Sequence, residues 1–412
     1  MVSFNDHFSL IEGVHSFSSQ NLVDDRFMLR SLVSYGGKVA LIAPEASLVV
    51  ASLTALEGWA SEVQLCPEGA LDDDFDGIVL TNPISKFLQS EKYIERDSSI
   101  KQNPLNTSWV MYTSGTSGKP KAVRKSLDSL VRSHRSDDAN GQKIWGLIYE
   151  PIRMAGIQVI THCLIGGHVL VATNTSETLS EKIKQFVTQK VDSLSATPTL
   201  WRQIMQTPEA QDLSLSQITL GGEIADQKTL NALKKFFPDA RISHVYASTE
   251  VGVGFAVHDQ LEGFPLSFLE DVNRNPQLRV NGEILEVGIA SDNDLIRWES
   301  TGDCVKIEAD RVKFLGRESG LINIGGAKVW PEDVERILRQ HPLVIDAVVK
   351  AKPSSFSGNI LVAEVKISTN EPEDLSKQLR KWVRSHAASY YVPASISINN
   401  EMTVSSTGKV KR

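Results

Sequence analysis

Short apolar runs alternate with longer amphipathic stretches along much of the chain. The apolar runs predict buried strands at residues 39–43, 78–80, 109–112, 168–172, 193–196, 217–220 and 242–246. The longer stretches predict helices at residues 46–59, 157–165 and 178–189, and in the last of these the apolar residues have the spacing of one helix face. This alternation indicates an α/β fold with parallel-type sheets, in which ligands bind at the carboxyl ends of the strands.

The pattern changes after the last of these strands. Short β-like segments at residues 278–280, 283–287, 295–298, 305–308 and 312–314 predict a small β subdomain. A compact α+β unit follows, with a helix that Pro331 opens and His341 ends, strands at 347–351 and 360–367, and a second amphipathic helix from Leu375 to Val383. We therefore expect an N-terminal domain of residues 1–316 and a small C-terminal domain of residues 317–412.

Length, charge and cysteine usage narrow the class of protein. A chain of 412 residues is too long for one compact core. Its 50 acidic residues outnumber 43 lysines and arginines, which argues against a nucleic-acid partner. We find neither a basic leader followed by an apolar segment nor a membrane span. Cys66, Cys163 and Cys304 form no CxxC pair, so we expect a cytoplasmic protein without structural zinc or disulfides.

Most of the candidate chemistry lies between Tyr112 and Lys121, directly after an apolar strand. Glycine lets backbone N–H groups approach an anion, hydroxyls donate hydrogen bonds, and lysine adds positive charge, so this composition suits a polyphosphate. The candidate phosphate-binding residues before Lys121 are Thr113, Ser114, Gly115, Thr116, Ser117 and Gly118. The spacing is not that of a Walker loop, and a solvated flexible loop is the alternative interpretation.

This stretch resembles the phosphate loop of the superfamily of acyl- and aryl-CoA ligases, peptide-synthetase adenylation domains and luciferases. It departs from the family pattern only at Ser117 and at Ala122. Four further motifs follow in the family's order: Gly221-Gly222-Glu223, Tyr246-Ala247-Ser248-Thr249-Glu250, Thr301-Gly302-Asp303 with Gly316-Arg317, and a C-terminal Ser406-Thr407-Gly408-Lys409. The resemblance runs from residue 36 to the C-terminus, with a shorter segment before the phosphate loop, which implies a shortened N-terminal subdomain.

The resemblance implies an ATP site. Gly222 and Glu223 would contact adenine, and the ring of Tyr246, followed by Ala247 in place of glycine and by Ser248, would stack on it. Asp303 would accept hydrogen bonds from the ribose hydroxyls, and Arg317 would also contact the nucleotide.

The catalytic residues implied by the resemblance are Lys121, Thr249, Glu250 and Lys409. Lys121 would hold the β- and γ-phosphates, Thr249 the α-phosphate, and Glu250 would bind Mg²⁺, which takes one or two carboxylates beside phosphate and water. Lys409 would stabilise the transition state as a carboxylate displaces pyrophosphate.

A thiol would then attack the acyl adenylate after the mobile C-terminal domain moves. The resemblance places the hinge at Ser319, where most relatives carry aspartate or lysine. It places Gly325 and Gly326 along the thiol channel, although a plain turn is the alternative for these two glycines.

The acid pocket would draw on Arg153, Met154, Gly156, Gly221 and His244. Arg153 either meets a polar substrate group or, as we favour, forms a salt bridge. We find no aspartate of the kind that anchors an α-amino group, so we expect an aromatic or a short to medium aliphatic acid.

The favoured function is an acyl-CoA ligase that uses ATP, Mg²⁺ and coenzyme A. One alternative is a stand-alone adenylation enzyme that loads the phosphopantetheine of an acyl carrier protein, and another is a non-catalytic nucleotide-binding relative. A basic segment with Lys377, Arg380, Lys381 and Arg384 could meet either acceptor or simply be a solvated helix face.

Overall fold

The computed structural model describes residues 4–13, 15–18, 26, 29–42, 45–81, 104–113, 121–131, 141–174, 176–248, 252–290, 296–354, 358–368, 372–399 and 402. The chain forms two compact units, of which the first comprises Met1–Ser195 and Thr207–Ile218 and the second Ala196–Gln206 and Thr219–Arg412. The expected division into residues 1–316 and 317–412 stays a prediction.

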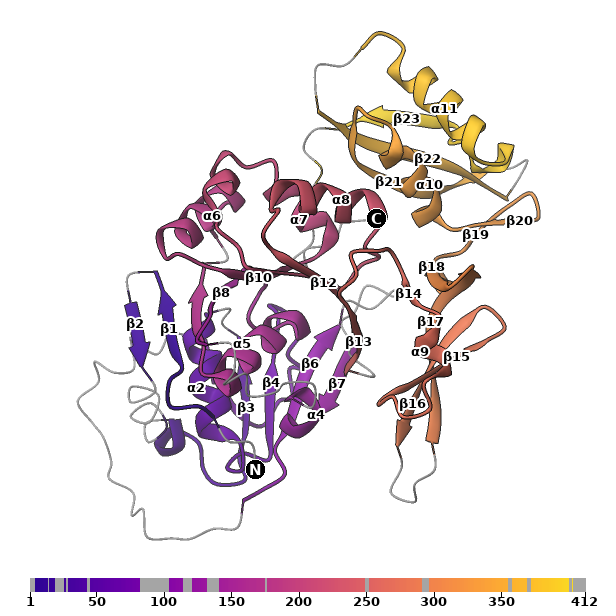
Figure 1. Ribbon diagram of the computed structural model, residues 1–412. Coiled ribbons are helices and arrows are strands. Elements are labelled where there is room, and N and C mark those ends of the chain that lie inside the picture. Colours follow the sequence, from indigo (N-terminus) through magenta and orange to yellow (C-terminus); the bar gives the residue numbers. More distant parts are fainter. Residues whose placement is uncertain are drawn as a thin grey trace. The chain divides into compact units, whose positions relative to one another are not determined.

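The first unit contains a five-stranded sheet with the order β5-β3-β4-β6-β7 (Figure 1). Its strands are β5 (Ile78–Leu80), β3 (Lys38–Leu41), β4 (Glu62–Leu65), β6 (Ser108–Thr113) and β7 (Lys121–Lys125). All pairs are parallel except β6 with β7, which form an antiparallel pair. Helix α2 (Ala46–Leu56) is buried almost throughout, as its nearly continuous apolar sequence predicts.

A second set of strands in this unit has the order β10-β8-β9-β1-β2. These are β10 (Ser193–Ala196), β8 (Ile144–Leu147), β9 (Val169–Ala172), β1 (Ser9–Glu12) and β2 (His15–Ser18). The helices of this region are α4 (Leu127–Val131), α5 (Met154–Gly166) and α6 (Leu179–Thr188), followed by a 3₁₀ turn, η1 (Pro208–Asp212). A capping box fixes the start of α6, where the Thr178 side chain accepts from the Glu181 N–H and Glu181 accepts from the Thr178 N–H.

The second unit begins with helix α7 (Pro198–Ile204). After residues 207–218, which belong to the first unit, strand β11 (Gln217–Gly221) brings the chain back into the second unit. Helix α8 (Gln227–Phe236), strand β12 (Arg241–Ser248) and strand β13 (Gly252–Val257) follow. An antiparallel sheet with the order β14-β18-β17-β16-β15 comes next, with helix α9 (Ser267–Glu270) beside it. Its strands are β14 (Phe264–Pro265), β15 (Gln277–Asn281), β16 (Ile284–Ala290), β17 (Ile296–Glu308) and β18 (Arg311–Arg317).

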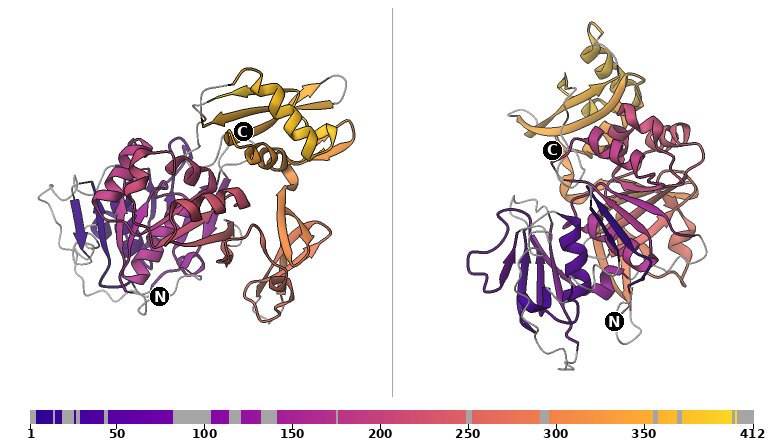
Figure 2. Two further views of the ribbon diagram at one scale, coloured as in Figure 1. Left: turned by 45° about the horizontal axis from the view of Figure 1, so that its top comes forward. Right: turned by 90° about the vertical axis from the view of Figure 1, so that its left-hand side faces the viewer.

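The C-terminal part of the second unit starts with a 3₁₀ turn, η2 (Glu318–Gly320), and a hairpin of β19 (Ile322–Ile324) and β20 (Ala327–Val329). Helices α10 (Pro331–Gln340) and α11 (Leu375–His386) then pack with a three-stranded sheet (Figure 2). Its strands are β21 (Val344–Ser354), β22 (Gly358–Ile367) and β23 (Ser395–Ile398), and η3 (Ser389–Tyr391) precedes the last. The shared core includes Val334, Leu338 and Leu379, as the helical periodicity predicted.

The predicted mixed α/β class is confirmed, with two differences in detail. The two strands expected at 295–298 and 305–308 form one strand, β17, because a register shift between Cys304 and Val305 absorbs the irregular Thr301-Gly302-Asp303 stretch. The sequence did not predict strands β1, β2, β4, β7, β8, β13, β14, β19, β20 and β23, or helices α4, α7, α8 and α9. Within the part of the chain that the structure describes, we find no helix long and apolar enough to cross a membrane.

Candidate active site

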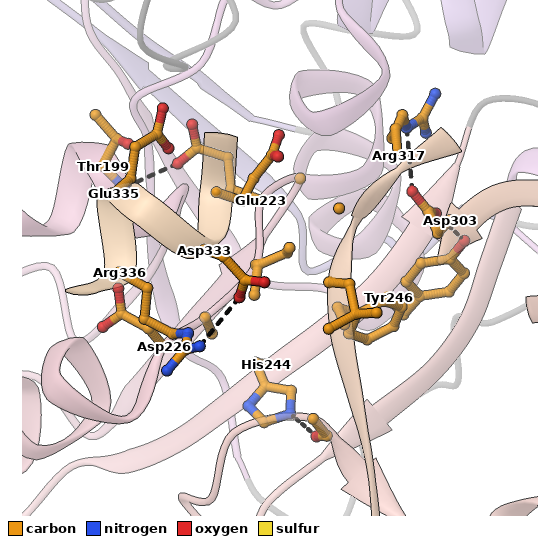
Figure 3. A pocket seen from close by; sticks show the side chains of 18 of the residues that line it. Thr199, Glu223, Asp226, His244, Tyr246, Asp303, Arg317, Asp333, Glu335 and Arg336 are labelled. Atoms are coloured by element: carbon orange, nitrogen blue, oxygen red, sulfur yellow. Dashed lines mark hydrogen bonds and ion pairs between the residues drawn. The ribbon is translucent and has the colours of Figure 1, made fainter. Parts of the chain in front are cut away.

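The second unit contains a cavity of about 320 Å³, a volume at the lower end for small-molecule sites (Figure 3). Residues that follow β11, residues of β12, β17 and β18, and one side of α10 line it. Seven residues that the sequence assigned to the nucleotide or acid site lie around this cavity: Gly222, Glu223, His244, Tyr246, Ala247, Asp303 and Arg317. The structure therefore brings together residues from motifs that are far apart in the sequence.

Asp303 is the centre of the polar contacts on one side of the cavity. The hydroxyl of Tyr246 donates to Asp303 Oδ2 at 2.5 Å, and Arg317 Nε donates to Asp303 Oδ1 at 3.1 Å. The Asp303 side chain is only 15% exposed, whereas that of Arg317 is 59% exposed. Burial and the neighbouring Asp303 carboxylate raise the pKa of Tyr246, so its hydroxyl stays protonated and donates.

The backbone of β17 explains how Asp303 reaches this position. Gly302 has a φ of +69°, a conformation that glycine adopts readily. The Thr301 hydroxyl donates to the Leu285 carbonyl at 2.7 Å and accepts from the Asp303 N–H at 3.1 Å. Asp303 also lies opposite Arg317 in the register of β17 and β18. The Thr-Gly-Asp motif thus forms a kink inside a strand, not a turn between strands.

The ring of Tyr246 lies nearly parallel to two phenylalanine rings. The ring centroids are 5.2 Å apart for Phe255 and 5.3 Å apart for Phe314, with interplanar angles of 16° and 13°. A Cβ on Gly254 would lie 3.0 Å from Tyr246 Cδ1, so the glycine leaves room for the ring. These contacts fix the position of the tyrosine hydroxyl, while stacking on adenine stays a prediction.

Glu223 lies across the cavity from Asp303 (Figure 3), and Gly222, the residue before it, also lines the cavity. Gly222 has a φ of +78°, which ends the straight course of β11. Glu223 Oε2 accepts from the Thr199 N–H at 3.0 Å, at the amino end of α7. A carboxylate there satisfies a helix N–H and is attracted by the helix dipole, so Glu223 stabilises the cavity wall.

The residues predicted for the acid pocket lie in both units. His244 lines the cavity, and its Nε2 contacts the Gly263 carbonyl at 2.8 Å; burial lowers the pKa of His244, which favours the neutral imidazole. In the first unit, Arg153 Nε forms an ion pair with Glu150 at 2.8 Å, and the half-buried Met154 begins α5. A Cβ on Gly156 would lie 2.2 Å from the Glu150 carbonyl oxygen, so packing alone requires glycine there.

Gly221 ends β11, and a Cβ on it would meet only the Val245 carbonyl oxygen at 3.7 Å. Ser319 lies exposed in η2, and Gly325 and Gly326 are exposed between β19 and β20. Lys121 begins β7 and is exposed, opposite Thr113 in the register of β6 and β7.

Several predicted residues fall outside the part of the chain that the structure describes. These are Ser114, Gly115, Thr116, Ser117, Gly118, Thr249, Glu250 and Lys409, and only the backbone of Thr113 and Ser248 is described. Within the described ranges, we find no group of three or more histidine, cysteine or acidic side chains that could hold a metal ion. The roles assigned to these residues therefore stay predictions.

The sequence did not predict the contribution of α10 to the cavity. Glu332, Asp333, Glu335, Arg336 and Arg339 of this helix line it. Their spacing is ordinary for an amphipathic helix with a polar face, so nothing in the local sequence distinguishes them from a solvated surface.

Comparisons with known proteins identify the family of the chain. The family model "AMP-binding enzyme" matches residues 40–278, and the model "AMP-binding enzyme C-terminal domain" matches residues 333–409. The 2-succinylbenzoate–CoA ligase of Staphylococcus aureus is 25% identical over 358 residues, which cover 78% of this chain and 70% of the ligase. The D-alanine–D-alanyl carrier protein ligase of the same species is 24% identical over 374 residues, covering 82% of this chain and 76% of that protein.

Surfactin synthase subunit 1 of Bacillus subtilis is 23% identical over 376 residues, and the match spans 78% of this chain but only 10% of that much longer protein. Two solved structures share the fold. The o-succinylbenzoate CoA synthetase of Bacillus subtilis with its acyl adenylate gives a TM-score of 0.70 at 17% identity, covering 98% of this chain and 93% of the other. An anthranilate CoA ligase with anthranoyl-AMP gives 0.73 at 16% identity, covering 98% and 92%. Because the first family model matches more than half of the residues of this chain, the chain belongs to the AMP-binding enzyme family and is an AMP-forming ligase of the adenylate-forming superfamily.

Proposed function

We propose that the chain couples a non-amino carboxylic acid to AMP with release of pyrophosphate, and then transfers the acyl group to the thiol of coenzyme A. The observation that carries the nucleotide half of this proposal is the Asp303 carboxylate, which already accepts a hydrogen bond from a hydroxyl and lies beside Arg317 in the cavity. A carboxylate in this setting suits ribose hydroxyls, and an exposed guanidinium suits phosphate or ribose oxygens.

In the first step the substrate carboxylate would attack the α-phosphate of ATP, and the phosphoanhydride bond to pyrophosphate would break. Asp303 and Arg317 would fix the nucleoside, and Lys409 would offset the negative charge that builds on the phosphate. Holding both reactants in line accounts for much of the acceleration expected of such a site. Loss of one aligned charge contact typically lowers the rate by ~10²–10³-fold.

The contacts of Arg153 support an acid without a second carboxylate. Its guanidinium already pairs with Glu150 at 2.8 Å and donates to the Tyr112 carbonyl at 3.4 Å. Half-buried Met154 would present a flexible apolar wall. Two of the similar proteins have names that specify acids with an aromatic ring, the dicarboxylate 2-succinylbenzoate and the monocarboxylate anthranilate. An aromatic acid is therefore the first substrate class to test, with short to medium aliphatic acids next.

The second candidate acceptor is the phosphopantetheine of a carrier protein. Helix α11 has the sequence LSKQLRKWVRSH, with no acidic residue, and Lys377, Lys381 and Arg384 on it are exposed. Carrier-protein loading is also what the name of one similar protein, the D-alanine–D-alanyl carrier protein ligase, specifies. An acidic carrier would complement such a helix, and so would the phosphates of coenzyme A.

The test is acid-dependent pyrophosphate release across a panel of aromatic and aliphatic acids, without acceptor, with coenzyme A, and with a phosphopantetheinylated carrier protein. We expect release that depends on one acid class and rises with coenzyme A. Lys409→Ala should abolish release, whereas Lys411→Ala, two residues away, should retain it. Stimulation by the carrier alone would support the second candidate, and no release with any acid would refute the proposal.

A further inference from the structure

A cluster of buried charges connects α7 and α8 with α10 and β21 inside the second unit. It contains Arg202 on α7, Asp226 before α8, Glu335 and Arg339 on α10, and Asp346 on β21. Their side chains are 4–11% exposed. Charged side chains are seldom this buried unless they are paired, so the cluster constrains how these four elements fit together.

Two ion pairs of the cluster are short. Arg202 Nη2 lies 3.0 Å and 3.1 Å from the two carboxylate oxygens of Asp346, and also donates to Thr199 Oγ1 at 2.9 Å. Arg339 Nε donates to Asp226 Oδ2 at 2.8 Å. The other oxygen of Asp226 accepts from the Thr229 N–H at 2.8 Å, as the N-cap of α8. Each pair therefore joins an element that precedes β12 to an element that follows η2.

Lys228 on α8 adds a third contact. Its ammonium group donates to the carbonyl oxygens of Arg339, His341 (3.3 Å) and Val344 (3.1 Å). These carbonyls lie at and just beyond the end of α10, where a helix leaves acceptors unsatisfied and where its dipole attracts a cation. Lys228 therefore acts as a C-terminal cap that α8 supplies to α10.

The charge cluster also holds α10 with one side facing the cavity. Arg202, Asp226, Glu335 and Arg339 all line it, so the ion pairs seat α10 as one of its walls. The exposed tip of the β19–β20 hairpin, with Gly325 and Gly326, is not among the described residues that line it. A thiol that attacks an adenylate in this cavity needs an entry path, and α10 in this position closes one side.

We infer that Arg202, Asp226 and Lys228 are positioning residues that hold α10 against the cavity during acyl-adenylate formation and release it for thiol transfer. The inference rests on the two-step function proposed above. In the held arrangement each charge lies beside a counter-charge, although the buried Arg202 Nε has no hydrogen-bond partner, and after release water solvates each group. Intermediate separations leave buried charges unpaired, which is strongly unfavourable, so the cluster behaves as a latch with two states.

Asp226→Asn tests the latch with little change in shape. Asparagine is as good an N-cap as aspartate, so α8 should keep its start, but Arg339 loses its buried counter-charge. Breaking a buried pair in this way should lower the held-to-released ratio by about a hundredfold or more. Glu364→Gln is the matched control, because it removes one charge from an exposed pair with Lys350 in the same C-terminal part.

The first readout requires no activity. Spin labels on Lys235→Cys in α8 and Lys381→Cys in α11, both exposed, report the distance between the two halves of the cluster, and the three native cysteines are buried. We expect one narrow distance distribution for the parent and for Glu364→Gln, and a broad, longer one for Asp226→Asn. Lys228→Met should shift the distribution in the same direction. An unchanged distribution in both variants would overturn the latch.

The second readout separates the two half-reactions. Acid-dependent ATP–pyrophosphate exchange should fall by about a hundredfold in Asp226→Asn, whereas thiol transfer from a preformed acyl adenylate should not fall. Equal losses in both half-reactions would indicate a general structural role and would refute the inference. If the parent shows no exchange but the spin-label distances respond as expected, the proposed function fails and the latch itself stands.

Discussion

Asp303→Asn probes the nucleotide contact most directly, because the substitution changes charge and hydrogen-bonding type with almost no change in shape. In the parent, both carboxylate oxygens accept hydrogen bonds, one from Tyr246 and one from Arg317. The amide can still accept from Arg317 through its oxygen, and it can donate to the tyrosine hydroxyl through its nitrogen. The fold around the kink in β17 should therefore survive the change.

The magnitude follows from the hydrogen bonds to the nucleotide that the substitution removes. Two ribose hydroxyls that donate to the carboxylate would find only one acceptor oxygen in the amide, and that oxygen is uncharged. Hydrogen bonds to charged groups contribute about 1.5–3 kcal/mol each, so AMP should bind ~10- to 150-fold more weakly. The pair with Arg317, whose side chain is 59% exposed, contributes little to stability, so the free energy of unfolding should change by no more than about 1 kcal/mol.

Titration calorimetry with AMP, together with urea unfolding, checks both numbers. Tyr246→Phe is the matched comparison, since it keeps the Asp303 charge and the ring contacts with Phe255 and Phe314 but removes the tyrosine hydroxyl. It should weaken AMP binding by less than Asp303→Asn does. Equal AMP affinity in the parent and in Asp303→Asn, at unchanged stability, would refute the assignment of Asp303 to the ribose.

Three further changes test the scaffold. Glu223→Ala removes the acceptor for the Thr199 N–H and should lower the free energy of unfolding by about 0.5–2 kcal/mol in urea, whereas Glu223→Gln should lose less. Gly156→Ala places a Cβ 2.2 Å from the Glu150 carbonyl oxygen and should cost about 1–3 kcal/mol in the same assay, so an unchanged midpoint would contradict the described packing. Burial alone would raise the pKa of Asp226, but two neighbouring guanidinium groups outweigh it and lower the pKa to about 2. This folded-state pKa lies below the unfolded value, so the stabilisation is present above about pH 4 and lost as pH falls towards 2; the parent should lose about 2 kcal/mol more than Asp226→Asn over that interval.

The local pattern of apolar and polar residues predicted several strands and helices correctly. The strands at Ile78–Leu80 and Ser193–Ala196 coincide with the predicted ones. The first is a short apolar run, and its length favours a buried strand over a helix. Helix α10 begins at Pro331 as predicted, since proline at the first turn loses no hydrogen bond.

Pairing with distant segments decided what the local pattern missed. Strand β7 (Lys121–Lys125) has no buried residue, and it is a strand because β6 pairs with it. The Thr301-Gly302-Asp303 sequence is typical of a turn, yet its neighbours on both sides keep it inside β17. Strand propensity depends on such cross-strand neighbours, which a single sequence does not show.

Some residues of the site could likewise be predicted from the sequence, and others could not. The resemblance to a known superfamily led to Gly222, Tyr246, Asp303 and Arg317, and the structure gathers these residues at one cavity. The buried ion pairs have no such signature. Arg202 and Asp346 are 144 positions apart, and each by itself is an ordinary charged residue of a helix or strand. Only the tertiary structure shows that they are buried and face one another.

The position of Arg317 links nucleotide binding to the backbone that follows it. Arg317 is the last residue of β18, the exposed turn η2 begins at the next residue, and Ser319, the proposed pivot, lies one residue further. If the chain pivots at Ser319 as predicted, a nucleotide that contacts Arg317 would influence the same few backbone dihedral angles that this motion changes. Thermodynamic linkage makes this influence mutual, so any substitution that shifts the conformational equilibrium at Ser319 changes nucleotide affinity by the factor with which nucleotide shifts that equilibrium. The conformation of η2 would then report whether nucleotide is bound, without any measurement on the nucleotide itself.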